Sequence, residues 1–106
     1  MSIFKRIADA IFGTYTPGAI TRAELDQLIQ KRAVNVEGQQ NWRTSIVDLL
    51  KVLDVPSDLD ARAELAHELG YKGKLDGSME MNNWLHQAVM QKLCETGGEV
   101  PASFKD

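Results

Sequence analysis

Apolar residues recur about every 3.6 positions in five segments of the chain, which is the period of an amphipathic helix. No segment shows the sustained alternation of apolar and polar residues, or the density of β-branched residues, that is typical of a strand. The predicted helices begin near positions 2, 21, 41, 58 and 78. The pattern therefore predicts an all-α fold.

The first predicted helix, residues 2–12, places its apolar residues on one side. Its charged residues Lys5, Arg6 and Asp9 lie away from the apolar side. A glycine follows directly, and glycine, proline and hydroxyl side chains then gather over the next positions, as they do in linkers. The chain is therefore divided into an amphipathic N-terminal helix at 1–13, a linker at 14–20, a helical core domain at 21–96 and a C-terminal tail at 97–106.

The core domain is predicted to be a compact bundle of about four helices, and the short amphipathic N-terminal helix precedes it. Its first helix begins at Thr21, because Thr21 and Glu24 have the spacing of a capping box. Its second helix begins after Asn41, which is a suitable N-cap. The apolar stripe of this second helix is the most regular in the chain and comprises Trp42, Ile46, Leu49, Leu50 and Leu53.

Proline and glycine mark the limits of the last two core helices. Pro56 ends the preceding helix, and Ser57 is expected to cap a helix over residues 58–69. Gly70 fits a left-handed position after that helix, with Tyr71 placed for the contact of a Schellman motif. The expected core residues are Leu59, Ala63, Leu65, Ala66 and Leu69 in this helix, and Met81, Trp84, Leu85, Ala88, Val89 and Leu93 in the helix that begins near Ser78.

Composition supports one small domain that folds without disulfides or a structural metal. The chain has 106 residues, of which 43% are hydrophobic and 25% are charged, which is ordinary for a globular protein. Its single cysteine, Cys94, cannot form an intramolecular disulfide, so a cytoplasmic location is expected. The basic pair Lys5 and Arg6 interrupts the N-terminal apolar stretch, which argues against a signal peptide. No apolar run reaches the roughly 18 residues of a membrane-spanning helix.

Several strings of the second half of the chain resemble a known family. They are Trp42-Arg43-Thr44-Ser45-Ile46-Val47-Asp48-Leu49, Glu64-Leu65-Ala66-His67-Glu68-Leu69-Gly70-Tyr71 with Gly73, Met81-Asn82-Asn83-Trp84-Leu85-His86, Val89-Met90, Gly97-Gly98 and Val100-Pro101, together with Ile11-Phe12-Gly13 near the N-terminus. The chain resembles the small bacterial proteins grouped as domain of unknown function 3597. The resemblance covers residues 42–101 well and the N-terminus loosely. It implies an all-helical bacterial domain and implies no catalytic, cofactor-binding or metal-binding residue.

Reactive side chains are few and show no catalytic spacing. His67 and His86 fall on different predicted helices, and no pair of histidines or cysteines has metal-ligand spacing. No nucleophile-elbow pattern surrounds a serine. We therefore expect no enzyme activity, no cofactor and no metal, with both histidines on a helix surface or rim. The alternative is a small ligand-binding protein or enzyme that uses polar residues of the core, namely Ser45, Asp48, His67 and His86.

Charge argues against nucleic acid as a partner. The formal net charge is −3, so the chain as a whole does not attract phosphate backbones. The helix that would read DNA in a helix-turn-helix carries Asp58, Asp60, Glu64 and Glu68 against Arg62 alone. We interpret these residues as a solvated acidic face with an Asp58–Arg62 pair one turn apart.

The N-terminal helix gives the leading functional hypothesis, which is a non-enzymatic helical interaction module. A helix of this length is marginal in water unless its apolar side docks on something. The chain's own domain is the favoured surface, followed by a protein partner or a second copy, and then by peripheral contact with an anionic membrane. The residues expected to make a partner or membrane contact are Ile3, Phe4, Ile7, Ile11 and Phe12.

Overall fold

Short polar side chains begin four of the five helices in the described part of the chain. In each case a hydroxyl oxygen accepts a hydrogen bond from a backbone N–H of the first turn, which satisfies a group that the helix itself leaves unpaired. The caps are Ser2 for α1 (Ile3–Phe12), Thr21 for α2 (Arg22–Ala33), Ser45 for α3 (Ile46–Val52) and Ser78 for α5 (Met79–Thr96). At α2 the capping box of Thr21 and Glu24 is complete, as its spacing predicted.

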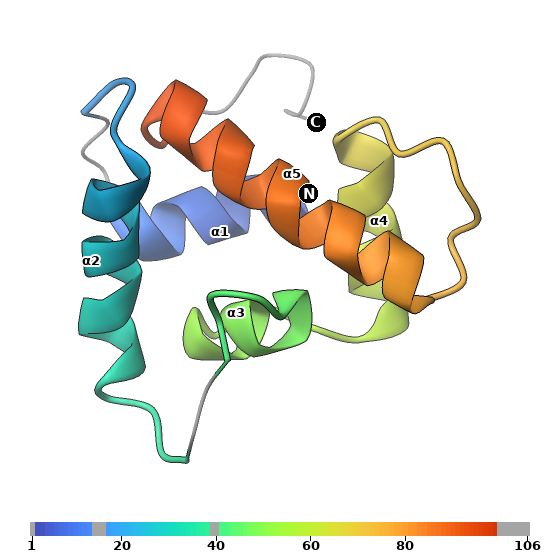
Figure 1. The fold of residues 1–106 in the computed structure, drawn as a ribbon, viewed down its shortest axis with the longest axis horizontal. Helices are drawn as coiled ribbons and strands as arrows, with labels where there is room; N and C mark the ends of the chain where they lie inside the picture. The colour runs from blue at the N-terminus through green and yellow to red at the C-terminus, as the bar shows by residue number, and fades with distance from the viewer. Residues whose placement is uncertain (1, 14–16, 39–40, 100–106) are drawn as a thin grey trace.

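The computed structural model describes residues 2–13, 17–38 and 41–99. These residues form the five helices and no strand, which confirms the all-α prediction. The remaining helix, α4, spans Leu59–Glu68. In Figure 1 the long helix α5 crosses the middle of the molecule, α2, α3 and α4 lie around it, and α1 lies behind it.

One core joins all five helices, and α1 is part of it. Ile3, Phe4, Ile7 and Ala8 are buried, and α1 packs against α2 and α4. The N-terminal helix therefore docks on its own domain, which was the favoured expectation. The most completely buried large side chains are Trp42, Phe4, Ile7, Leu25, Ile29, Ile46, Leu49, Leu50, Leu53, Leu65, Met81 and Leu85.

Helix α3 begins later than its apolar stripe predicted. Residues 42–44 form a turn, in which the carbonyl oxygen of Asn41 accepts hydrogen bonds from the N–H groups of Thr44 and Ser45. Asn41 is thus not the N-cap, because Ser45 holds the first turn through the N–H of Asp48. Trp42 is buried all the same, so the stripe identified core residues correctly while extending the helix too far.

Helix α4 differs from its prediction in its N-cap and in its buried face. Asp58, not Ser57, is the N-cap residue, and it makes no side-chain cap bond. Leu59 is 42% exposed, whereas Ala61 is buried, because the arc that meets the core runs through Ala61 and Leu65. Arg62 does not pair with Asp58.

The Arg62 guanidinium is instead held on the side of α5. It donates to the carbonyl oxygen of Ser57 at 3.0 Å and to Oδ1 of Asn82 at 2.7 Å. At the other end of α4 the Schellman motif is confirmed. Gly70 has φ +85°, and the N–H of Tyr71 donates to the carbonyl oxygen of Ala66 at 2.9 Å.

The described part of the linker packs against the end of α5. The N–H of Ile20 donates to the carbonyl oxygen of Cys94 at 2.9 Å. Gly97 ends α5 with φ +58°, and a Cβ there would lie 1.6 Å from the carbonyl oxygen of Gly18. Only glycine fits this contact. The rest of the linker, residues 14–16, and the end of the tail, residues 100–106, lie outside the described residues.

Candidate functional site

The five side chains predicted for partner or membrane contact fall into two groups. Ile3, Phe4 and Ile7 are buried among the chain's own helices. Ile11 and Phe12, at the end of α1, are only partly buried and pack at the edge of the core. Accessible apolar surface on α1 is therefore concentrated at its C-terminal end.

A carboxylate of α4 holds the first turn of α1 in place. The hydroxyl of Ser2 donates to one oxygen of Glu68, and the N–H of Ile3 donates to the other oxygen at 2.7 Å. Negative charge at a helix N-terminus is also favourable because the unpaired N–H groups there carry partial positive charge. Sequence reasoning missed this contact, since it placed Glu68 on a solvated acidic face. No local pattern links residues 66 positions apart.

An apolar groove of about 290 Å³ lies between the end of α1 and α2. We call it the α1–α2 groove. Its apolar lining comes from Ile11, Phe12, Pro17, Ile20 and Leu28. Its polar lining comes from Glu24, Gln27 and Lys31 of α2.

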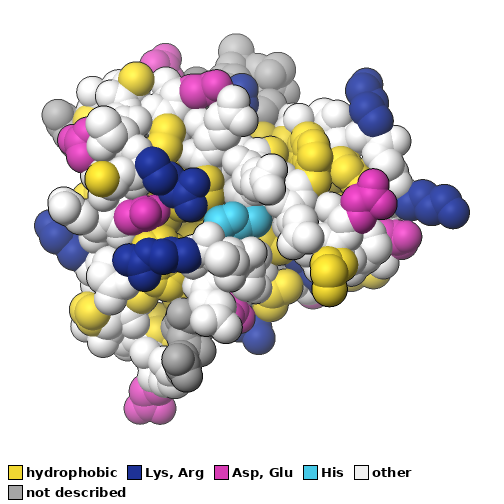
Figure 2. All heavy atoms as spheres, viewed as in Figure 1, with side chains coloured by type: hydrophobic (Ala, Val, Ile, Leu, Met, Phe, Trp, Pro, Cys, Tyr) yellow, Lys and Arg dark blue, Asp and Glu magenta, His cyan; other side chains and the backbone are white. Residues whose placement is uncertain are grey.

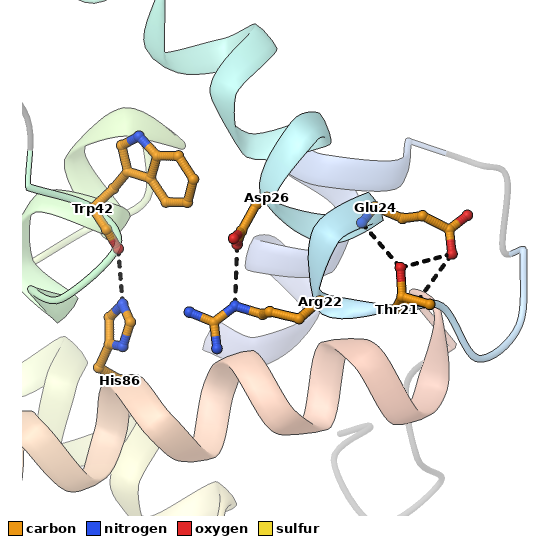
Figure 3. A network of polar contacts seen from close by, with 6 residues as sticks. All are labelled: Thr21, Arg22, Glu24, Asp26, Trp42 and His86. Atoms are coloured by element: carbon orange, nitrogen blue, oxygen red, sulfur yellow. Dashed lines mark hydrogen bonds and ion pairs between the residues drawn. The ribbon is translucent and has the colours of Figure 1, made fainter.

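His86 is a buried group, not the surface or rim residue that the sequence predicted. Its side chain on α5 is 6% exposed, and its Nε2 lies 2.8 Å from the carbonyl oxygen of Trp42 (Figure 3). A carbonyl only accepts, so Nε2 carries the proton. Burial is the main cause that lowers the His86 pKa, and the nearby Arg22 charge lowers it further. The Trp42 hydrogen bond and Asp26 oppose this shift.

A second, polar hollow of about 320 Å³ opens beside His86. We call it the His86 cleft. Its lining residues are Arg22, Arg43, Thr44, Asn83, His86 and Gln87. On the face shown in Figure 2, Lys or Arg side chains flank a histidine on the side of α2.

The two arginines of the cleft are each fixed by one neighbour. Nε of Arg22 donates to Oδ1 of Asp26 at 3.1 Å, one helical turn along α2 (Figure 3). The guanidinium carbon of Arg43 lies 4.2 Å from the centre of the Trp42 ring, which is a cation–π contact. Both guanidinium groups retain N–H donors that these contacts do not use.

The four polar residues of the alternative site do not meet in the cleft. Only His86 lines it. Ser45 caps α3, and Asp48 accepts a hydrogen bond from the N–H of Asn41 at 2.9 Å. His67 is exposed on α4.

Within the described residues, no group of three or more His, Cys, Asp or Glu side chains is placed to hold a metal ion. Cys94 is half-buried, and burial is the main cause that raises the pKa of its thiol. None of the helices in the described ranges combines the length and apolar character that crossing a bilayer requires.

Five helices around one core, with an apolar groove and a polar cleft on the surface, define a small all-α domain. The family described as Domain of unknown function (DUF3597) matches residues 15–101, and the chain belongs to this family. The match confirms the resemblance seen at residues 42–101 and extends it toward the N-terminus.

A solved structure supports the same fold. The solution structure of a conserved unknown protein from Rhodopseudomonas palustris is 38% identical in sequence, with a TM-score of 0.68 and a match over 100% of each chain. No curated protein matches the chain in sequence. Neither the family description nor the name of the neighbour states an activity. The groove and the cleft are the structural features that bear on function.

Proposed function

We propose that the chain is a non-enzymatic helical interaction module of a bacterial cytoplasmic protein, and that it associates with a second copy of itself through the α1–α2 groove. One observation carries the proposal. The groove exposes parts of Ile11, Phe12 and Leu28 next to each other, with an acidic and a basic side chain of α2 on its border. Adjacent apolar side chains in a concave surface with a polar rim are typical of interaction sites.

The charges along α2 favour a second copy over an unrelated partner. Glu24, Leu28 and Lys31 lie on the groove side of this helix. Glu24 and Lys31 are seven residues apart, which is about 10 Å along the helix axis. In an antiparallel twofold arrangement centred near Leu28, Glu24 of each copy lies opposite Lys31 of the other. Such self-complementarity is what a twofold interface requires.

Glu24 is ionised at neutral pH, which the pairing needs. Hydrogen bonds from Thr21, first from its N–H and then from its hydroxyl, lower the pKa of the Glu24 carboxyl. Both hydrogen bonds use Oε1. The other oxygen is therefore available to a cation of the second copy.

A stable interface of standard size takes about 800 Å² from each partner. A dimer centred on the groove therefore also uses the surface around it. Helix α2 buries only Leu25 and Ile29 in its own core, and Glu24, Gln27, Leu28 and Lys31 line the groove. The side chains with catalytic potential, Ser45 and Asp48, are occupied in backbone hydrogen bonds. This supports association in preference to catalysis.

Sedimentation equilibrium of the full chain from micromolar to millimolar concentration tests the proposal. We expect a reversible dimer, and Leu28→Glu should abolish it by placing an unpaired charge in the apolar centre. Glu64→Lys, a charge change on exposed α4, serves as the control and should leave dimerisation unchanged. A wild-type chain that stays monomeric at millimolar concentration would overturn the proposal.

A charge swap separates the interface from the capping box. Glu24→Lys and Lys31→Glu should each weaken the dimer, by roughly fivefold, and the double variant should regain the lost affinity. Because the double variant still lacks Glu24 in the capping box, recovery would come from pairing between copies. Failure of the double variant to recover, with α2 still helical by amide exchange, would exclude the antiparallel arrangement.

A further inference from the structure

We propose that the His86 cleft is a binding site for an oxyanion, a carboxylate or phosphate group of a small molecule. The cleft shares no lining residue with the α1–α2 groove. The inference is therefore independent of self-association and can succeed or fail separately. At about 320 Å³ the cleft has the size of a small-molecule site.

Two guanidinium groups converge on this cleft in a chain whose net charge is −3. Asp26 occupies Nε of Arg22, which leaves the terminal N–H groups of that arginine for a ligand. The Arg43 guanidinium carbon lies over the Trp42 ring, and this contact uses none of its N–H donors in hydrogen bonds. A guanidinium edge binds carboxylate or phosphate oxygens with two parallel hydrogen bonds. Both arginines are thus held in position with their anion-binding donors open.

Neutral donors complete the lining on the side of α5. Asn83 and Gln87 are one turn apart on that helix, and both are exposed. Their amide groups can donate to an anion without adding charge. Thr44, in the turn before α3, also lines the cleft, and its hydroxyl makes only a long hydrogen bond, 3.5 Å, to the carbonyl oxygen of Asn41. The lining therefore offers donors from three separate segments of the chain.

His86 adds selectivity for a particular protonation state of the ligand. Its Nε2–H is committed to Trp42, and its other ring nitrogen faces the side of the cleft where Arg22 lies (Figure 3). In the neutral ring this nitrogen is an acceptor. It fits an anion that also carries a hydroxyl, such as monoprotonated phosphate or a hydroxycarboxylate. The charged groups around the ring are Arg22, Asp26 and Arg43.

A titration followed by NMR tests the inference on the full chain. Inorganic phosphate, citrate and chloride are added separately at fixed ionic strength, and backbone and side-chain amide signals are recorded. We expect saturable shifts at Thr44, Asn83 and Gln87 with phosphate or citrate and none with chloride. The tighter of the two oxyanions identifies the chemical class. Shifts that rise linearly, and equally for chloride, would overturn the site.

Variants link that binding to the cleft. Arg22→Gln and Arg43→Gln should each weaken anion binding about tenfold. Arg43→Lys should retain only part of the affinity, because lysine keeps the positive charge but lacks the two parallel N–H donors of a guanidinium. Arg6→Gln, which removes an exposed charge on α1, is the matched control and should not weaken binding. Amide spectra of each variant verify its fold. Saturable binding that survives both glutamine substitutions would refute the assignment.

Bound anion should also change the titration of His86. A negative charge in the cleft offsets the Arg22 charge and stabilises the imidazolium, in which the second ring nitrogen becomes a donor to an anion oxygen. This charge effect outweighs the hydrogen bond to the neutral ring, so the His86 pKa should rise when phosphate or citrate is bound. His67, exposed on α4, is the internal control in the same spectra. An unchanged His86 titration at saturating anion would contradict contact with the ring.

Discussion

Helices α1 and α2 are neighbours in the chain and similar in length, yet they are stabilised in different ways. Helix α1 buries Ile3, Phe4, Ile7 and Ala8 and receives the Glu68 carboxylate at its first turn. Helix α2 buries only Leu25 and Ile29. A short helix gains most of its stability from packing, so a helix with little packing needs strong local signals.

Those local signals are present in α2. Its capping box is complete, the Arg22–Asp26 pair spans its first turns, and Lys31 and Arg32 lie in its last turn, where positive charge is favourable. In this molecule a strong apolar stripe marks the helix that docks. A strongly capped helix with few apolar residues is free to present its surface.

Truncation of a buried side chain should show the largest difference between the two helices. Phe4→Ala on α1 removes a fully buried ring, and we expect it to lower the free energy of unfolding by about 4 kcal/mol. Leu28→Ala on α2 removes a half-buried side chain and should cost less than about 1 kcal/mol. Urea unfolding of both variants measures these values. If Phe4→Ala lowered the free energy of unfolding as little as Leu28→Ala, α1 would not be an integral part of the core.

Loss of the Glu68 contact should have an intermediate effect. Glu68→Ala removes both hydrogen bonds to the start of α1 and should cost about 2 kcal/mol. Glu68→Gln keeps an acceptor oxygen and should cost less. The exposed Glu64 on the same helix provides the control, since Glu64→Ala should change stability by no more than about 0.5 kcal/mol. Thermal unfolding, with amide exchange at Ile3, would reveal whether α1 loosens first.

Removal of the α2 cap should have the smallest global effect. Thr21→Ala leaves the N–H of Glu24 without its partner, and we expect a loss of about 1 kcal/mol. Thr21→Ser keeps the hydroxyl and should retain most of the stability. Hydrogen exchange should accelerate at the first turn of α2 and remain unchanged in α1. Equal acceleration in both helices would mean that α2 does not depend mainly on its own cap.

Local signals explain which features the sequence could predict. Thr21, Ser78, Gly70 and the apolar stripes act within a few residues, so the helices and most of the core could be predicted. The start of α3 could not, because Asn41 and Ser45 both have N-cap chemistry. Only the turn between them decides which residue begins the helix.

The candidate sites depend on contacts between distant residues. The partner of Ser2 is Glu68, and the partner of His86 is the carbonyl of Trp42, 44 residues away. Neither a glutamate nor a histidine has a periodic signature in the sequence. The sequence therefore predicted Glu68 on an acidic surface and His86 at a rim. The cleft likewise requires Arg22, Arg43 and Asn83 to meet from three segments. Such convergence becomes visible only once the helices are arranged in space.

The contact between Gly18 and Gly97 has a kinetic consequence. Together with the hydrogen bond from Ile20 to Cys94, it joins the segment after α1 to the end of α5. The chain must close a loop that contains α2, α3 and α4 before these backbones meet. Closing this loop lowers the entropy of the chain before the contact contributes any stabilisation. Native contacts of long sequence separation slow folding. We therefore expect docking of this segment to come late in folding, and folding to be slower than that of a simple bundle of sequentially paired helices of equal size.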